Sequence, residues 1–465
     1  MDTWPDLTWP GLDAVAAEAR AFAAGWAGQR ASLATILGSR GLIDAASVAV
    51  VTGQQSAVGG GPFYTLVKIA HACALAGQLR QRGVLAQPVF WCASEDHDAG
   101  EASHADLIKR SGDLRRVSVA LPLARASLRF CPASSWWDAL VERCRNDLST
   151  NISAATWLDA RRPQADEGMG AWLCRLVEEL FSAHGLICVE AHRLRPLWRD
   201  VMDQALTDWP TAALAATRQA VLAAGHQDAF GPLLDPPVFM DASDGRRLLT
   251  LAEAQRGFAA DVDRLSPGAA LRPLFQQAAL PAALYVAGPG ECAYHRFLAP
   301  LHAHFGLPRQ RLVPRCSLTL LPIPCRRAIT RWGGTVADIL AGGHAPTRPS
   351  PAATVLAGFD AELEYLRIEA ETAEVDRQNR LRAGHRRLSR ERDRLARSLA
   401  RSDLRAAGLP PWGSLASYLL PRGQRQERSL SLFQVLWENG PEIAERLVTA
   451  AREAGPAGQG VVEIA

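Results

Sequence analysis

Short apolar runs without a polar break recur along the chain, each followed by glycines or acidic residues and then by a helical pattern. The clearest runs are residues 47–52, 88–93 and 284–287. An unbroken run of β-branched and aromatic residues is typical of a strand buried on both faces, as in a parallel sheet. A strand, a loop, a helix and a second strand in this order indicate a parallel pair with a right-handed crossover. The pattern therefore predicts an α/β fold.

Weaker patterns divide the rest of the chain. A helix is expected before about residue 41, and further strands are expected at 186–190 and 311–313. Residues 407–465 have a mixed composition and are expected to form helices that pack back on the core. The predicted core has three parts and two connecting insertions, the second of them small and β-rich. The core parts are 1–111, 167–225 and 266–356, and the insertions are 112–166 and 226–265.

Residues 357–406 are strongly charged and rich in arginine. Leu381, Leu388 and Leu395 lie seven residues apart in this stretch. A helix of roughly 45 residues would be about 70 Å long, too long for one domain to wrap. The spacing therefore predicts a coiled coil or a protruding helix. Gly384 lies in the middle of the run and would break the helix into a hairpin if it interrupted it.

Composition narrows the class of protein. Hydrophobic residues make up 48% of the 465 residues, but no apolar run approaches the roughly 20 residues that span a bilayer. Residues 1–6 lack the basic end and apolar stretch of a signal peptide. Nine cysteines without a CxxC pair fit neither a disulfide framework nor a zinc ribbon. With a net charge of +3 as well, we expect a cytoplasmic protein with reduced thiols and neither a membrane nor nucleic acid as partner.

The first loop with candidate chemistry follows the apolar run at 47–52. Glycines between a buried strand and a helix let backbone N–H groups point at a phosphate or a carboxylate. The loop has neither the Walker A nor the GxGxxG spacing, and a tight turn without a ligand is the alternative. Lys68 in the following helix is one of only two lysines in a chain whose other basic residues are arginines. Either this position needs a compact ammonium group, or the lysine is there by chance. The expected binding residues here are Thr52, Gly53, Gln54, Gln55, Gly60, Gly61 and Tyr64.

An acidic loop follows the second run. Glu95, Asp96, His97 and Asp98 are adjacent, with Glu101 and His104 just beyond. Ligands bind at the carboxyl ends of strands in open α/β sheets. The cluster is suited to taking a proton from an amine or, as a less favoured interpretation, to holding a divalent metal. The alternative is helix capping, with Asp96 or Asp98 as the capping residue.

A third glycine loop follows the run at 284–287. It places several polar side chains at the start of a helix, where they would face the same cleft. Upstream, an LRPLFQQ segment offers two more polar groups that are either anion contacts or structural. The candidate binding residues of these two segments are Gly288, Gly290, Glu291, Tyr294, His295, Arg272 and Gln276, and His104 just beyond the acidic loop is a further candidate.

Taken together, these segments resemble the bacillithiol biosynthesis cysteine-adding enzyme family. The matching stretches are VVTGQQ…GGGPFYTLVK, PVFWCASEDHD..E, LRPLFQQ…LYVAGPGECAYHR, LVPR and PRGQRQERSLSLF, in the order of the family and over nearly the whole chain. The chain departs from the family in its abbreviated long helix, in its SAVGGGP loop and in Ala99-Gly100, where an aromatic residue is common. The resemblance implies a Rossmann-like core of the nucleotidyltransferase type, with insertions and a C-terminal coiled coil that pairs two subunits.

The resemblance also implies an activity: a ligase that joins the carboxyl of cysteine to the amine of glucosaminyl malate, forming bacillithiol. ATP or another nucleotide is the expected energy source, with magnesium as a possible companion and no tightly bound cofactor. The chain has no HxGH and no KMSKS-like segment, so the sequence does not support an adenylate route. In this scheme Lys68 would offset the negative charge that develops during the reaction. His97 or a neighbouring acid would deprotonate the amine. The expected catalytic residues are Glu95, Asp96, His97, Asp98 and Lys68.

Two other functions remain open at this point. One is a related enzyme that transfers a nucleotide to another acceptor. The other is a non-catalytic assembly protein that is built on the coiled coil and keeps a ligand pocket. The density of titratable groups in the acidic loop argues against a mere scaffold, because clustered like charges add nothing to one.

Overall fold

The computed structural model divides the chain into two compact units. The first unit comprises residues within 1–109, 114–320 and 426–462, and the second is built mainly from residues 321–425. Residues 1–6, on which the signal-peptide expectation rests, lie outside the described residues. No described helix is long and apolar enough to cross a bilayer. The described residues are 7–38, 41–109, 111–121, 126–242, 245–346 and 352–464.

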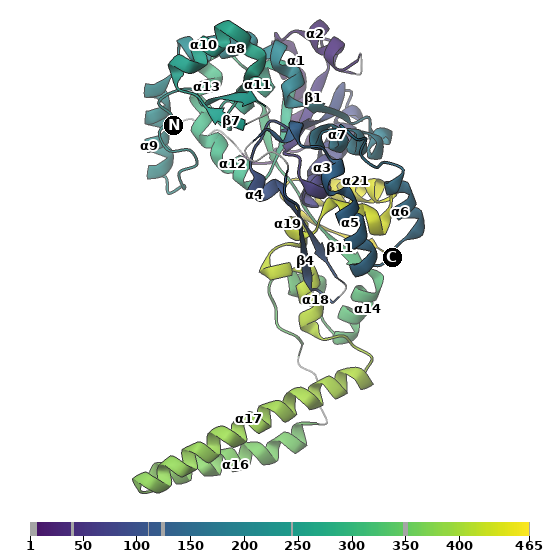
Figure 1. Ribbon diagram of the computed structural model, residues 1–465, viewed down its shortest axis with the longest axis vertical. Coiled ribbons are helices and arrows are strands. Elements are labelled where there is room, and N and C mark those ends of the chain that lie inside the picture. The colour runs from purple at the N-terminus through teal and green to yellow at the C-terminus, as the bar shows by residue number, and fades with distance from the viewer. Residues whose placement is uncertain are drawn as a thin grey trace. The chain divides into compact units, whose positions relative to one another are not determined.

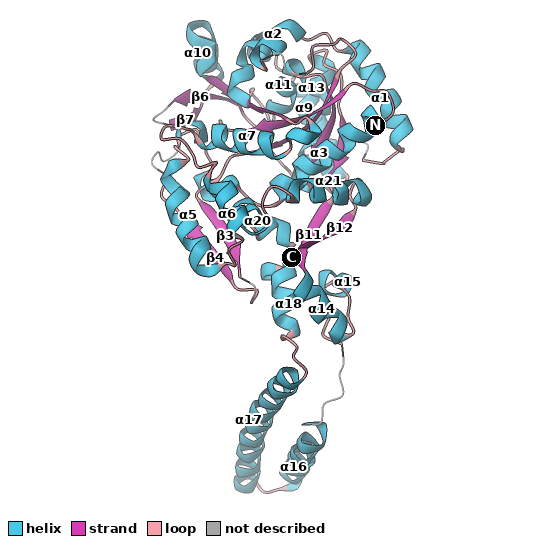
Figure 2. Cartoon of the chain, turned by 90° about the vertical axis from the view of Figure 1, so that its right-hand side faces the viewer, coloured by secondary structure: helices cyan, strands magenta, loops and turns pink. Residues whose placement is uncertain are grey.

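A five-stranded parallel sheet forms the centre of the first unit (Figures 1 and 2). Its neighbouring strands are all parallel, in the order β10-β9-β1-β2-β5. Each apolar run that the sequence singled out forms one of them, which confirms the predicted α/β fold. The strands are β1 (Val48–Gln54), β2 (Ala86–Cys92), β5 (Ile187–Glu190), β9 (Ala282–Ala287) and β10 (Arg311–Pro314).

The strand order reverses at β1. From β1 the chain adds β2 and then β5 on one side, and it later adds β9 and β10 on the other side. The loops that follow β1 and β9 therefore diverge at the carboxyl edge of the sheet and leave a crevice between them. This reversal point is where open α/β sheets bind their ligands.

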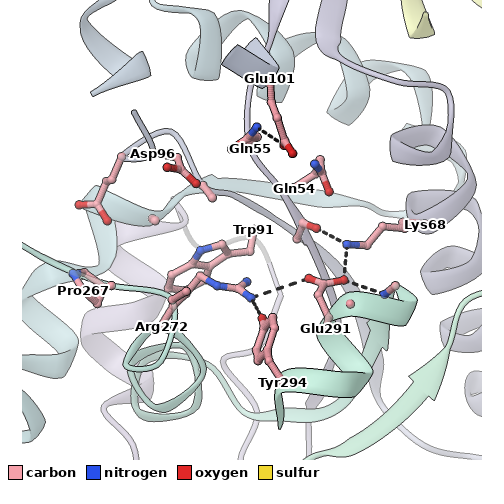
Figure 3. Close-up of a pocket in the computed structure, with 18 of the residues that line it drawn as sticks. Gln54, Gln55, Lys68, Trp91, Asp96, Glu101, Pro267, Arg272, Glu291 and Tyr294 are labelled. Carbon is pink, nitrogen blue, oxygen red and sulfur yellow. Dashed lines mark hydrogen bonds and ion pairs between the residues drawn. The ribbon is translucent and has the colours of Figure 1, made fainter. Parts of the chain in front are cut away.

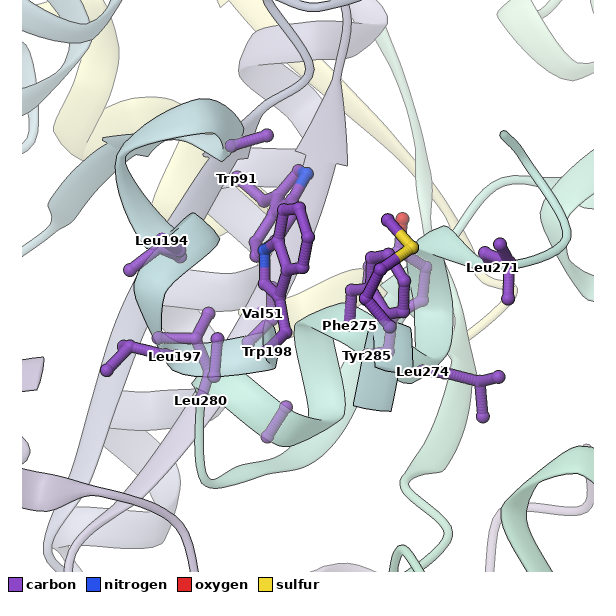
Figure 4. Packing of buried hydrophobic residues seen from close by; sticks show 14 of the residues in the cluster. Val51, Trp91, Leu194, Leu197, Trp198, Leu271, Leu274, Phe275, Leu280 and Tyr285 are labelled. Atoms are coloured by element: carbon purple, nitrogen blue, oxygen red, sulfur yellow. The ribbon is translucent and has the colours of Figure 1, made fainter. Parts of the chain in front are cut away.

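The two faces of the sheet are both covered. Val48 and Val50 pack with helices α1 (Leu12–Gly25) and α3 (Tyr64–Arg80), and the alternate residue Val51 belongs to the core of the other face. That second core stacks the ring of Trp198 on Phe275, with centroids 4.5 Å apart, beside Trp91 (Figure 4). Burial on both faces explains why the strands read as unbroken apolar runs. Helix α3 also packs along α21 (Ile443–Ala454), so it is buried nearly all round.

Small antiparallel sheets lie beside the central one. One is a hairpin of β3 (His104–Ile108) and β4 (Leu114–Ser118). The other places β6 (Val238–Ala242) between β7 (Gly245–Leu248) and β8 (Leu265–Pro267). A pair, β11 (Ser317–Pro322) and β12 (Gln459–Ile464), joins distant parts of the chain. The β6–β7–β8 sheet matters for the site, because it supplies an arginine and a phenylalanine to the same crevice.

The helices around these sheets follow in chain order. They are α2 (Arg30–Ile36), α4 (Ala99–Ala102), α5 (Ser134–Asp147), α6 (Ile152–Asp159), α7 (Met169–Leu180), α8 (Arg199–Thr207), α9 (Thr211–Ala223), α10 (Leu251–Asp261), α11 (Arg272–Ala279), α12 (Pro289–His295), α13 (Ala299–His304) and α20 (Leu432–Asn439).

The arginine-rich segment of the second unit is a helical hairpin. Helices α16 (Ala352–Thr372) and α17 (Val375–Ala406) lie side by side (Figures 1 and 2). Arg392 Nε of α17 lies 2.9 Å from Asp360 Oδ1 of α16, an exposed ion pair between the two helices. The single long helix is therefore replaced by two, and the chain turns at 373–374 rather than at Gly384, which lies inside α17.

Candidate active site

A cavity of about 820 Å³ opens at the carboxyl edge of the sheet, where the strand order reverses. The loops after β1, β2 and β9 all contribute to it, as do α3, α11 and the β6–β7–β8 sheet (Figure 3). Much of its lining was singled out in the sequence. Those lining residues are Gly53, Gln54, Gln55, Tyr64, Lys68, Glu95, Asp96, His97, Glu101, Arg272, Gly288, Gly290, Glu291 and Tyr294.

A buried ion pair lies between the β1 and β9 loops. Lys68 Nζ is 2.7 Å from Glu291 Oε2 and also donates to the carbonyl oxygen of Gly53 (Figure 3). Burial lowers the pKa of Lys68, and the Glu291 carboxylate opposes that shift. Burial alone would raise the pKa of Glu291, but Lys68 and Arg272 outweigh it and hold the pKa at about 2. Glu291 therefore stays ionised, and it also accepts the N–H of Gly288 at 2.7 Å.

Arg272 extends this network through two phenols. Its guanidinium donates to the hydroxyl of Tyr285 at 3.2 Å and to that of Tyr294, and it lies 3.7 Å from Glu291 Oε1. Burial raises the pKa of Tyr294 to about 12, against the nearby cation of Arg272. The phenols are therefore neutral. His295, next in the helix, is buried and stacks on Tyr294, and burial lowers its pKa to about 4.

The acidic loop divides into structural and cavity-facing residues. Glu95 is buried and accepts from Arg195 Nε at 2.8 Å, and Arg195 also pairs with Asp241 at 2.7 Å. Asp98 caps the short helix α4, since its side chain accepts the N–H of Glu101 at 3.1 Å. The capping alternative is thus correct for Asp98.

Asp96 and His97 are the two members of the acidic loop that keep exposed side chains on the cavity wall. Their side chains are 41% and 34% exposed, respectively, and both line the cavity. Asp96 Oδ1 accepts the backbone N–H of His97 at 2.8 Å and lies 3.7 Å from His97 Nδ1. His104, in contrast, begins β3 opposite Ser118 and does not line the cavity.

Some of the expected binding residues lie elsewhere. Gly60 has a φ of 81°, and a Cβ there would lie 3.0 Å from Leu432, because the glycine loop packs closely against α20. Gly61 accepts the N–H of Leu432 at 2.8 Å, so both glycines pack against α20 and neither lines the cavity. The predicted residues absent from the cavity lining are Thr52, Gly60, Gly61, Asp98, His104, Gln276 and His295.

Arg246 of β7 is the most informative residue that the sequence did not single out. Its side chain is 7% exposed, and its NH1 lies 3.1 Å from His97 Nδ1. In the sequence, an Asp-Gly pair comes just before Arg246 and predicts a turn. It does not predict that the arginine then lies on the wall of the cavity.

Two further arginines line the cavity. Arg315 lies over the ring of Tyr64, 5.5 Å from its centroid, and pairs with Glu427 at 2.7 Å. Arg428 also lines the cavity and makes no ion pair within the described part of the chain. Nearby, Gln55 donates to Glu101 at 2.9 Å (Figure 3). The cavity lining thus contains several arginines and one lysine.

The carboxylates do not converge on a common point. Among the described residues there is no group of three or more His, Cys, Asp or Glu side chains placed to hold a metal ion. In the acidic loop, Glu95 is committed to Arg195 and Asp98 to its helix cap. The metal interpretation of this loop therefore has no ligand set to support it in these residues.

Comparison with known proteins agrees with this architecture. Residues 29–231 and 241–316 match the family model described as "Bacillithiol biosynthesis BshC, N-terminal Rossmann-like domain". A protein of Thermus thermophilus named "Putative cysteine ligase BshC" is 29% identical over 441 residues, covering 87% of this chain and 86% of that protein.

Proteins with the same name occur in other bacteria. The one from Koribacter versatilis is 26% identical over 445 residues, covering 87% of this chain and 82% of that protein. The one from Geobacillus thermodenitrificans is 30% identical over 354 residues, covering 67% of this chain and 62% of that protein. Since the family model alone matches more than half of the residues, the chain belongs to the BshC family of bacillithiol biosynthesis, with its Rossmann-like domain.

Proposed function

We propose that this protein is a ligase that joins the carboxyl of cysteine to the amine of glucosaminyl malate, forming bacillithiol. The observation that carries the proposal is the cavity at the carboxyl edge of the sheet. There the Lys68–Glu291 pair and the Asp96–His97 pair line the same space in a chain of this family. Its relatives are named cysteine ligases, which supports the choice of cysteine as a substrate.

The charges of the cavity suit anionic substrates. The malate half of the proposed acceptor carries two carboxylates, and cysteine brings a third. Guanidinium groups bind carboxylates and phosphates through paired N–H donors, which makes arginine the residue of choice for such ligands. Arg315 and Arg428 both line the cavity, and Arg428, which makes no ion pair among the described residues, is placed to bind an anionic group of a substrate.

A free carboxylate does not form an amide in water without activation. ATP, as a co-substrate, would supply it by converting the carboxylate to an acyl phosphate or an acyl adenylate. The cationic side chains of the cavity fit its phosphates, whereas Gly60 and Gly61 do not, because they contact α20.

The residues of the chain have separate roles in this proposal. An ammonium has three N–H donors, and Lys68 uses two of them on Gly53 and Glu291. The third would stabilise the negative charge that develops on the carbonyl oxygen during attack. Asp96 or His97 would take the proton that the amine loses as the C–N bond forms, while phosphate or AMP leaves.

The proposal is tested by mass spectrometry of reactions that contain the full chain, cysteine, glucosaminyl malate, ATP and magnesium. We expect a cysteine-dependent product with the mass of bacillithiol, together with ADP or AMP, and its loss when ATP is omitted. Product without ATP would contradict the proposed energy source. No product from folded protein, with nucleotide attached to another acceptor instead, would overturn the ligase in favour of nucleotide transfer.

A further inference from the structure

Arg246 is held in place on the wall of the cavity by three groups that do not belong to the reaction. Its Nε donates to Ser266 Oγ at 3.0 Å, and its NH2 donates to the carbonyl oxygen of Pro267 at 2.8 Å. Its guanidinium lies over the ring of Phe239, 4.2 Å from the centroid. These contacts leave NH1 directed at His97 Nδ1, at 3.1 Å.

This contact decides where the proton of His97 is. A guanidinium has only donors, and it stays protonated in proteins even where burial lowers its pKa, as burial does for Arg246. His97 Nδ1 must therefore accept, and the proton of the neutral imidazole lies on Nε2. Asp96 is the competing partner, since its Oδ1 lies 3.7 Å from the same Nδ1 and 3.8 Å from Arg246 NH1.

We infer that Arg246 is a positioning residue that makes His97 a hydrogen-bond donor through Nε2 and leaves Asp96 as the base. The second half of this inference rests on the proposed function. With Nδ1 accepting from Arg246 and Nε2 protonated, the imidazole has no lone pair for the ammonium of a substrate. Asp96 keeps one, because its Oδ2 makes no hydrogen bond or ion pair among the described residues, and the residue lines the cavity.

The charged groups behind Arg246 are consistent with this arrangement. Glu95 and Asp241 lie close enough to favour the charged guanidinium, while Arg195, which binds both of them, opposes it. Removal of the Arg246 cation would leave Asp96 as the nearest partner of Nδ1. The proton would then move to Nδ1, and Nε2 would gain a free lone pair.

The position of the proton can be measured without any assay of activity. In the full chain with ¹⁵N-labelled histidine, the signals of His97 are those lost in His97→Asn. We expect a protonated Nε2 and an unprotonated Nδ1 in the wild type, and a protonated Nδ1 in Arg246→Met. Arg246→Lys, which keeps a cationic donor, should restore the wild-type pattern at least in part. The matched control is Arg247→Met, at the exposed neighbour on the same strand. It should leave both ¹⁵N signals of His97 as they are in the wild type.

A protonated Nδ1 in the wild type would overturn the inference, as would an unchanged ring in a folded Arg246→Met protein. The assignment of the base is tested by activity. His97→Gln places an amide N–H near the position of Nε2 and should keep product formation within about tenfold, whereas His97→Ala and Asp96→Asn should lose on the order of 10²–10⁴-fold. Equal loss in His97→Gln and His97→Ala, with Asp96→Asn active, would make His97 the base. If the wild type makes no product, the proposed function fails, and the proton position still stands or falls by the ¹⁵N signals.

Discussion

At the scale of single residues, Lys68 and Arg246 each make contacts in the cavity wall that suit their own kind of cation. Lys68 is 2% exposed and contacts a carbonyl oxygen and a carboxylate, which fits a compact ammonium with three donors. Arg246 makes planar contacts on several sides, which fits a guanidinium fork. Exchanging the two side chains would therefore break both sets of contacts.

The chain contains two lysines, which provides a matched pair of variants. Lys68→Met should lower kcat by about 10²–10³-fold, because it removes the donor proposed to stabilise charge in the transition state. Lys109→Met should leave kcat near that of the wild type, since Lys109 pairs with Asp147 and does not line the cavity. Steady-state kinetics on both proteins check the prediction.

Loss of the Lys68 ammonium also leaves the buried carboxylate of Glu291 with less positive charge beside it. The single variant is therefore expected to be less stable as well. The double variant Lys68→Met with Glu291→Gln removes both charges and should recover stability without recovering kcat. A double variant that regains turnover would mean that Lys68 acts only by neutralising Glu291.

At the scale of elements, the helical hairpin places Gly384 inside α17 with open space where a Cβ would be. Gly384→Ala should therefore stabilise the second unit by roughly 0.5–1 kcal/mol, because alanine loses less backbone entropy in a helix. Urea unfolding followed by circular dichroism at 222 nm measures the change.

Gly408, just after the same helix, is the contrasting control. Its φ of 60° lies in the left-handed region, so Gly408→Ala should destabilise by roughly 1–2 kcal/mol. If Gly384→Ala is destabilising as well, Gly384 does not lie in regular helix, and the turn belongs where the sequence suggested it.

At the scale of the whole molecule, buried histidines predict acid sensitivity. Burial lowers the pKa of His71 and of His295 to about 4, and that of His302 to about 3. An exposed histidine in the unfolded chain titrates near 6.5, so the unfolded state binds more protons than the native state between these values. Stability is therefore fully present above about pH 6.5 and is lost as the pH falls toward 4.

Each of these histidines should contribute a slope of about 1.4 kcal/mol per pH unit in that window. The free energy of unfolding from urea titrations at several pH values measures the sum. His71→Gln should lower this slope by about 1.4 kcal/mol per pH unit, because glutamine does not bind a proton in this range. A free energy of unfolding that does not change between pH 6.5 and 4 would contradict the prediction.

The elements of the core could be predicted because their signal is local. Residues 47–52, 88–93 and 284–287 read as buried strands, since each residue of a doubly covered strand faces apolar atoms on one side or the other. Parallel strands then bring the loops that follow them to one edge, whatever the rest of the fold. That is why the sequence alone predicts that Gly53, Asp96 and Glu291 lie at one edge of the sheet.

The partners of these residues could not be predicted in the same way. Glu95 looked like its neighbour Asp96 in sequence, yet Arg195, one hundred residues away, buries it in an ion pair. Gly60 looked like a ligand-binding glycine, yet Leu432 of a C-terminal helix occupies the space that its missing side chain leaves. These roles depend on which distant surface packs against a loop, and local composition does not specify that.

The sequence by itself determined the core strands and the chemical groups in the loops at their carboxyl ends, because a strand buried on both faces reads as an unbroken apolar run. Only the tertiary structure decided which of these groups face the cavity. Arg246 of β7, which pairs with β6, meets His97 of the loop after β2 across 149 residues, and no local pattern in the sequence signals that contact.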